Sequence, residues 1–251
     1  MGTSNIFDGN NDRNPLLPDD YQPESQTGSN ISWKTAKTSM SKYISSGGTR
    51  GTAKAILRDY IKAGGGARQM MSAATSGINS ARNIGSFFSG VAQNGILPTL
   101  SELGVQFEGK TIQEVFSQLI NLMAPNSDTK EDITARIATQ AALRDLYVYI
   151  EQNSLELDAL NHIPQDIIDK ALKSFFKEYI WANFMKDMES RIEQYMDSTD
   201  SAFDREKELK DTIKAVVDVE YRKHTELLSK SIDEAVRHLM EKSLKSLEGI
   251  L

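Results

Sequence analysis

Apolar residues recur at helical spacing along most of the chain from residue 31 onward. Two early stripes are Ile56, Leu57, Tyr60 and Ile61, and then Met70, Met71, Ala74, Ile78 and Ala81. Spacings of three and four residues place such side chains on one face of an α-helix. The pattern predicts helices over residues 32–45, 50–63 and 67–93.

Two glycine clusters, Gly47-Gly48 and Gly64-Gly65-Gly66, separate these predicted helices. Glycine adopts the left-handed backbone conformation at little cost, and helices commonly end at such a residue. We therefore expect each cluster to end one helix and begin the next. Each cluster leads into an arginine in the frame Gly-Gly-x-Arg, at Arg50 and Arg68, which suggests a repeated helix-turn unit.

The remaining sequence predicts further helices. Its apolar stripes are Ile112, Val115, Phe116, Leu119 and Ile120, then Ile133, Ile137, Leu143 and Leu146, and then a broad face that runs from Ile168 to Tyr195. Pro164 stands at a first-turn position, where proline is tolerated. Two last helices are expected over 201–227 and 230–249, and the short segment VQFEG at 105–109 is the one candidate strand.

This pattern predicts an all-α fold, a multi-helix, bundle-like body preceded by an extended, largely irregular N-terminal tail. We expect a tail over 1–30, a basic, glycine-interrupted helical segment over 31–93, and a C-terminal helical region over 94–251 that packs with it. The tail prediction depends on Pro15, Pro18 and Pro23, because three closely spaced prolines disfavour both helix and packed core.

Charge is distributed unevenly in this chain of 251 residues with a net charge of −6. Nine basic residues and one acidic residue lie between Trp33 and Ser86, a local net charge of +8. Arg50, Lys54, Arg58 and Arg68 are candidates for contact with an anion or nucleic acid. Helix turns with solvated basic faces are the favoured interpretation, and an acidic partner or the chain's own acidic helices would use the same charges.

Most enzyme and metal chemistries find no support in the residues. The chain has no cysteine, which excludes thiolate nucleophiles and cysteine-based zinc sites. Its three histidines, His162, His224 and His238, lack metal-binding spacing, so we expect no metal site and no cofactor of the protein's own. No nucleophile motif occurs, and we expect a non-enzymatic, soluble, cytoplasmic protein without a membrane span.

The start of the chain, MGTS, offers one reactive group. Removal of the initiator methionine before a small residue leaves Gly2 with a free α-amine. Such an amine titrates near pH ~8, so a useful fraction is neutral and nucleophilic at cellular pH. Myristoylation is disfavoured because its motif requires serine or threonine where this chain has Ile6.

Several quoted segments together resemble a known family. These are the start MGTS, the segment NPLLPDD, the basic segment SSGGTRGTAKAILRDYIKAGGGAR and the helical GKTIQEVFSQL. They resemble the B component of the bacterial four-gene Qat anti-phage defence systems. The resemblance implies three companions: a 7-cyano-7-deazaguanine synthase-like (QueC-like) protein, an ATPase and a TatD-like nuclease.

The resemblance also implies a role for the tail. Relatives of the synthase activate a deazaguanine carboxylate with ATP and pass it to an amine, so Gly2 is expected to accept a covalent 7-deazaguanine. Thr3, Ser4, Leu16 and Leu17 are then expected to bind the synthase-like partner. The alternative is a nucleic-acid-binding or sensing scaffold that acts through the basic segment 33–86.

Overall fold

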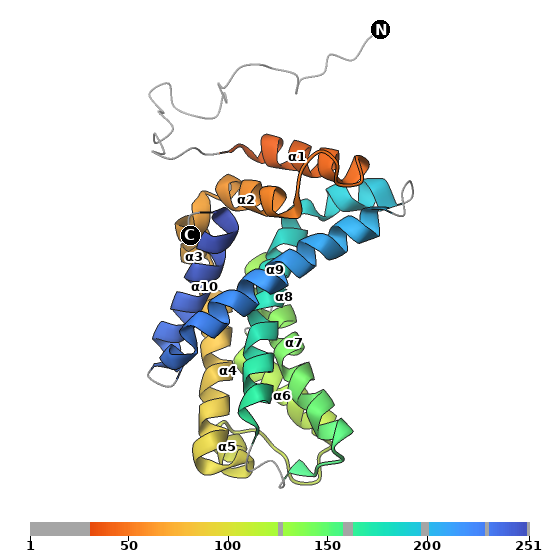
Figure 1. The fold of residues 1–251 in the computed structure, drawn as a ribbon. Coiled ribbons are helices and arrows are strands. Elements are labelled where there is room, and N and C mark those ends of the chain that lie inside the picture. Colours follow the sequence, from red (N-terminus) through yellow and green to blue (C-terminus); the bar gives the residue numbers. More distant parts are fainter. Residues whose placement is uncertain (1–30, 125–127, 158–162, 197–200, 229–230, 250–251) are drawn as a thin grey trace. The chain divides into compact units, whose positions relative to one another are not determined.

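The computed structural model describes residues 31–124, 128–157, 163–196, 201–228 and 231–249. These residues form ten helices and no strand, which confirms the predicted all-α class (Figure 1). The helices are α1 (Trp33–Ser45), α2 (Ala53–Ala63), α3 (Gly66–Ala73), α4 (Thr75–Asn94), α5 (Ile96–Glu102), α6 (Ile112–Met123), α7 (Lys130–Gln152), α8 (Gln165–Met196), α9 (Ser201–Leu228) and α10 (Ile232–Glu248).

Local capping residues set several of the helix starts. The hydroxyl of Ser32 accepts the Thr35 N–H at the start of α1, and Thr52 serves α2 in the same way. At the start of α7, Thr129 and Asp132 form a reciprocal capping box, which places Asp132 in the first helical turn. Such contacts satisfy backbone N–H groups that the helix itself leaves unpaired.

The glycines after α1 end that helix as expected. Gly47 has φ +61°, in the left-handed region. Its N–H donates to Ile44 O (3.0 Å), and the N–H of Gly48 donates to Tyr43 O (2.9 Å). This pair of hydrogen bonds is the Schellman arrangement, which satisfies the last carbonyl groups of a helix.

The predicted helix over 67–93 is two helices, α3 and α4, with a break at Ala74. The carboxylate of Glu131 on α7 explains the break. It accepts hydrogen bonds from the N–H of Ser76 (2.9 Å) and of Gly77 (2.8 Å). Because these donors turn to Glu131 instead of α3 carbonyl groups, the chain begins a new helix here.

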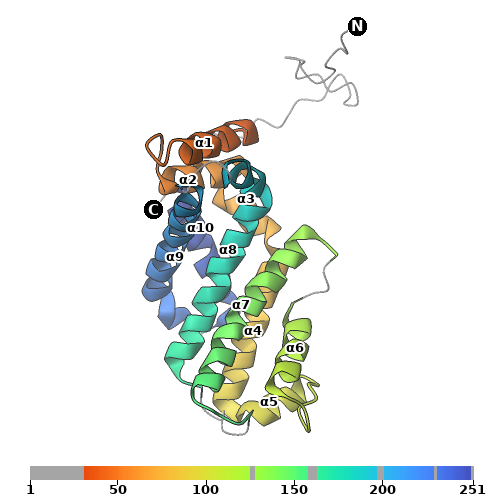
Figure 2. The same ribbon diagram turned by 90° about the vertical axis from the view of Figure 1, so that its right-hand side faces the viewer.

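Helices α7 and α8 form the most extensive helix pair, and they run side by side in both views (Figure 2). The buried face of α7 includes the small side chains of Ala135, Ala138 and Ala142. The expectation that Ile133 and Ile137 belong to this face is wrong, because these side chains are 47% and 44% exposed. Small alanine side chains let the two helix backbones approach closely, so they, and not the isoleucines, occupy the contact.

The candidate strand at 105–109 is also wrong. This segment is a loop between α5 and α6. The side-chain amide of Gln118 takes the place of a partner strand: it accepts the N–H of Gln106 (3.0 Å) and donates to Gln106 O (2.8 Å). Val105 is buried, so the alternating pattern reflects one anchored residue in a loop.

The last two predicted helices are confirmed as α9 and α10, which pack against each other. Helix α9 also lies against α8 and α2, and α10 contacts α2, α3 and α4. The backbone of His224 near the end of α9 departs from helical geometry (φ −127°, ψ 15°). The described residues from Ile31 onward form one unit with one continuous hydrophobic core.

Buried tyrosines connect different helices by donating hydrogen bonds to carboxylates. The hydroxyl groups of Tyr43, Tyr179 and Tyr221 donate to Glu208 (2.8 Å), Glu131 (2.7 Å) and Asp169 (3.0 Å) respectively. Burial, followed by the negative charge of the partner carboxylate, raises the pKa of Tyr179 far above its ordinary value. Each pair therefore keeps its tyrosine protonated and its donor satisfied within the core.

Candidate functional site: a groove along α9

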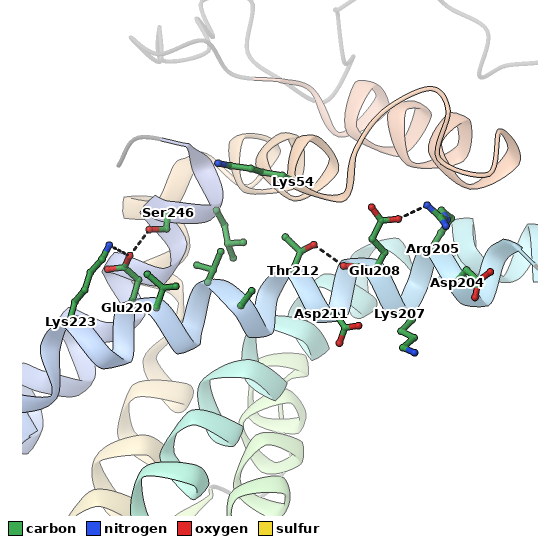
Figure 3. Close-up of a pocket in the computed structure, with 14 residues that line it drawn as sticks. Lys54, Asp204, Arg205, Lys207, Glu208, Asp211, Thr212, Glu220, Lys223 and Ser246 are labelled. Carbon is green, nitrogen blue, oxygen red and sulfur yellow. Dashed lines mark hydrogen bonds and ion pairs between the residues drawn. The ribbon is translucent and has the colours of Figure 1, made fainter. Parts of the chain in front are cut away.

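Helix α9, with parts of α2 and α10, forms a groove of ≈ 830 Å³ (Figure 3). We call it the α9 groove. Its apolar floor consists of Ala215, Val216 and Val219 of α9 and Leu247 of α10. Val219 is 38% exposed, which is unusual for a valine in the middle of a long helix. The groove thus offers an apolar strip of the kind that receives a partner's side chains.

One end of the groove is built around Glu208. This carboxylate accepts the hydroxyl of Tyr43 (2.8 Å) and pairs with Arg205 one turn earlier on α9. Burial first, and then the hydrogen bond to Glu208, raise the pKa of Tyr43 well above its usual value. A Cβ on Gly48 would lie 2.5 Å from the Arg205 guanidinium, so glycine at this position leaves room for that group.

The other end of the groove is built around Glu220, which is 2% exposed. Lys223 (2.9 Å) and the Ser246 hydroxyl (3.0 Å) donate to its Oε1 (Figure 3). Burial by itself would raise the pKa of Glu220, but these two hydrogen bonds, together with the charges of Lys223 and His224, outweigh it and lower the pKa. The carboxylate is therefore held ionised between α9 and α10.

Two of the three histidines meet beside this end. The rings of His224 and His238 lie edge to face with their centroids 4.4 Å apart. Burial, and then the neighbouring His224, lower the pKa of His238. Among the described residues, no group of three histidine, aspartate or glutamate side chains is placed to hold a metal ion. The ring contact joins α9 to α10, and His162 lies outside the described residues.

The predicted basic contacts are all exposed, but they do not share one site. Lys54 lines the α9 groove and extends from α2 above its floor (Figure 3). Arg58, one turn further along α2, pairs with Asp59 (3.2 Å). Arg50 lies in the loop before α2, and Arg68 lies on α3. Their contact with an anion or nucleic acid stays a prediction.

Several backbone amides of the two Gly-Gly-x-Arg frames already have partners within the chain. In the first frame, the N–H of Arg50 donates to the Ser46 hydroxyl (3.1 Å), beside the two glycine N–H groups that cap α1. In the second, the N–H of Ala67 donates to the carboxylate of Glu248 on α10 (3.0 Å). A carboxylate of the chain itself thus occupies the start of α3, where a phosphate was considered.

The predicted tail residues Gly2, Thr3, Ser4, Leu16 and Leu17 lie outside the described residues. Of the residues that line the α9 groove, Lys54 alone was a candidate from the sequence. Ala215, Val216 and Val219 lie within the helix that the sequence predicts over 201–227. The sequence signal for an exposed groove was the acidic and basic residues that flank these three positions, because a fully buried helix face rarely has so many charges beside it.

Comparison with known proteins identifies a family. The family model described as "Qat anti-phage system associated protein QatB" matches residues 65–247, which is most of the chain. The chain belongs to the QatB family. The QatB match begins between α2 and α3, so it contains the α9 and α10 parts of the groove and excludes Lys54. No curated protein and no solved structure matches the chain.

QatB membership confirms the resemblance seen in the sequence and makes the chain a component of an anti-phage defence system. It also implies that other Qat components are the protein's partners. None of the helices in the described residues is long and apolar enough to cross a membrane.

Proposed function

We propose that this protein is a non-catalytic component of a Qat defence complex whose N-terminal tail docks into the 7-cyano-7-deazaguanine synthase-like partner. Membership of the QatB family supports the proposal, because it makes other Qat components the partners of this chain. The resemblance described above implies that a synthase-like protein is one of them. The helical body supplies a stable base for the tail, and the α9 groove supplies a second surface for a partner.

The proposed chemistry takes place at the Gly2 amine. The partner activates a deazaguanine carboxylate as a mixed anhydride with AMP, and releases pyrophosphate from ATP. The neutral amine attacks the activated carbonyl carbon, a C–N bond forms, the C–O bond to AMP breaks, and the amine proton passes to a base. The product is an amide between the Gly2 nitrogen and the carboxyl carbon of the deazaguanine, and AMP is the leaving group.

Within this account, Leu16 and Leu17 anchor the tail in the partner. Replacing both with aspartate is expected to abolish co-purification with the synthase-like protein, because two charges cannot enter an apolar site. The matched control replaces Asn10 and Asn11 with aspartate, which adds the same charge elsewhere in the tail. Pull-down of the two variants side by side checks the prediction, and equal recovery of both would contradict the anchor role.

A nucleic-acid-binding scaffold is the second candidate, and the exposure of Arg50, Lys54, Arg58 and Arg68 favours it. Raising the salt concentration in the same pull-down separates the two functions. Binding through phosphate groups weakens steeply as salt rises, whereas an apolar tail in a protein pocket is much less sensitive. If nucleic acid is the ligand, Arg50→Glu with Arg68→Glu abolishes its binding and leaves the tail interaction intact.

A further inference from the structure

A second cavity, of ≈ 310 Å³, is lined by residues of α1, α2, α3, α8 and α10, and by Glu131 of α7. We call it the α8 cavity, because α8 contributes Tyr179, Asn183, Lys186 and Asp187. It shares no lining residue with the α9 groove. Ligand pockets range from about 300 to 1,000 Å³, so this cavity suits a ligand no larger than a single nucleobase or side chain.

One side of the α8 cavity is aromatic. Trp33 packs edge to face on Tyr60, with ring centroids 5.8 Å apart, and Tyr60 packs on Phe184 at 5.1 Å. Tyr60 and Phe184 are buried, but Trp33 is 39% exposed. Met70 and Met240 add polarizable sulfur atoms to the lining. These groups favour a flat, aromatic ligand over a saturated one.

The two carboxylates that line the α8 cavity, Glu131 and Asp187, differ in the number of hydrogen bonds that they already accept. Glu131 accepts three hydrogen bonds, from the N–H groups of Ser76 and Gly77 and from the hydroxyl of Tyr179. Within the described part of the chain, Asp187 accepts only a long hydrogen bond from Tyr60 (3.4 Å). Asp187 is therefore the carboxylate of the cavity that has acceptor capacity left for a ligand.

Lys186 adds a hydrogen-bond donor to the lining of the same cavity. The ammonium group of Lys186 donates one hydrogen bond to Asn183 Oδ1 (2.9 Å), which leaves two further donor positions. Asp187 and Lys186 thus present an acceptor and a donor from neighbouring positions of one helix. A ligand that matches both has N–H donors beside a carbonyl oxygen, on the edge of a flat ring.

We infer that the α8 cavity binds a free nucleobase with a guanine-type edge. The ring N–H and the amino group face the Asp187 carboxylate, the neighbouring carbonyl oxygen faces Lys186, and the ring lies against Trp33. Adenine fits less well, because its edge offers the carboxylate one donor, the exocyclic amino group, where guanine offers two adjacent donors. An arginine side chain fits poorly, because it has donors only and brings a second positive charge to Lys186.

Binding of a nucleobase is tested on the full chain expressed alone, so the outcome of this test does not depend on conjugation at Gly2. Ligand-observed NMR measures the binding of guanine, hypoxanthine and adenine. We expect guanine to bind about tenfold more tightly than hypoxanthine, which lacks the amino donor, and about tenfold more tightly than adenine, which lacks the ring N–H donor. Absence of guanine binding, or equal binding of guanine and adenine, overturns the inference.

Substitution of Asp187 separates recognition from general damage to the fold. Asp187→Asn is expected to weaken guanine binding at least tenfold and to remove the preference for guanine over hypoxanthine, since the lost carboxylate faced the amino group. Glu189→Gln, on the same helix but exposed and outside the cavity, is the matched control and keeps both properties. A preference for guanine that survives Asp187→Asn contradicts the proposed orientation.

Discussion

Replacement of Glu131 with alanine is expected to lower the free energy of unfolding by about 3 kcal/mol. The carboxylate accepts hydrogen bonds from the N–H groups of Ser76 and Gly77 and from the hydroxyl of Tyr179. Helix α4 has no side-chain cap of its own, and Tyr179 is 4% exposed. Because Gly77 and Tyr179 are buried, the variant leaves their donors without a partner carboxylate.

Thermal unfolding followed by circular dichroism measures this effect. For a chain of this size, about 3 kcal/mol corresponds to a fall in Tm of roughly 6–12 °C. Glu131→Gln keeps acceptor oxygen but loses the charge, so an intermediate fall is expected. Glu102→Ala, at an exposed position of α5, is the control. If Glu131→Ala unfolds at the temperature of this control, Glu131 does not hold the start of α4.

Replacement of Gly77 with alanine is expected to destabilise the fold by about 2–4 kcal/mol, although alanine favours helix by about 1 kcal/mol. A Cβ on Gly77 would lie 2.3 Å from the ring of Tyr179, far inside van der Waals contact. Tyr179 cannot move aside easily, because its hydroxyl is bound to Glu131 and its ring stacks on Phe175. The expected cost is therefore strain between α4 and α8.

Denaturant unfolding of Gly77→Ala and of Ser86→Ala, an exposed position on the same helix, checks this cost. The Ser86 variant is expected to lie within about 0.5 kcal/mol of the parent. Adding Tyr179→Ala to Gly77→Ala removes the clash, so the double variant is expected to be more stable than the sum of the single effects. Simple additivity would mean that the glycine is not required by the tyrosine ring.

The helices were predictable where their signals are local. Ser32 and Thr111 mark helix starts by their own side chains, and Gly47 marks a helix end by its backbone freedom. The break between α3 and α4 was not predictable in this way. It depends on Glu131, which lies on a different helix and reaches Ser76 and Gly77 only after the chain has folded.

Helical periodicity also leaves open which of two apolar faces is buried. Helix α7 has an isoleucine face at Ile133 and Ile137 and an alanine-rich face at Ala135 and Ala138. The larger side chains suggested burial of the isoleucines, but the close approach of α8 selects the small ones. Side-chain hydrophobicity alone does not contain this steric information.

The candidate sites were less predictable than the fold. His224 and His238 lie on different helices, and the packing of α9 against α10 brings their rings together. The α9 groove joins Lys54 to residues near the C-terminus, and the α8 cavity joins five helices and the start of a sixth. Such combinations depend on the tertiary arrangement, which no local pattern specifies.

Peptide mass spectrometry is the sharpest test of the proposed conjugation at Gly2 in this QatB family protein. The protein is expressed with and without the neighbouring synthase-like gene, and the peptide that begins at Gly2 is compared. We expect a mass increase on this peptide that requires the partner gene and equals the acyl group of a 7-deazaguanine carboxylate. An unmodified Gly2 amine in the presence of an active partner would contradict it.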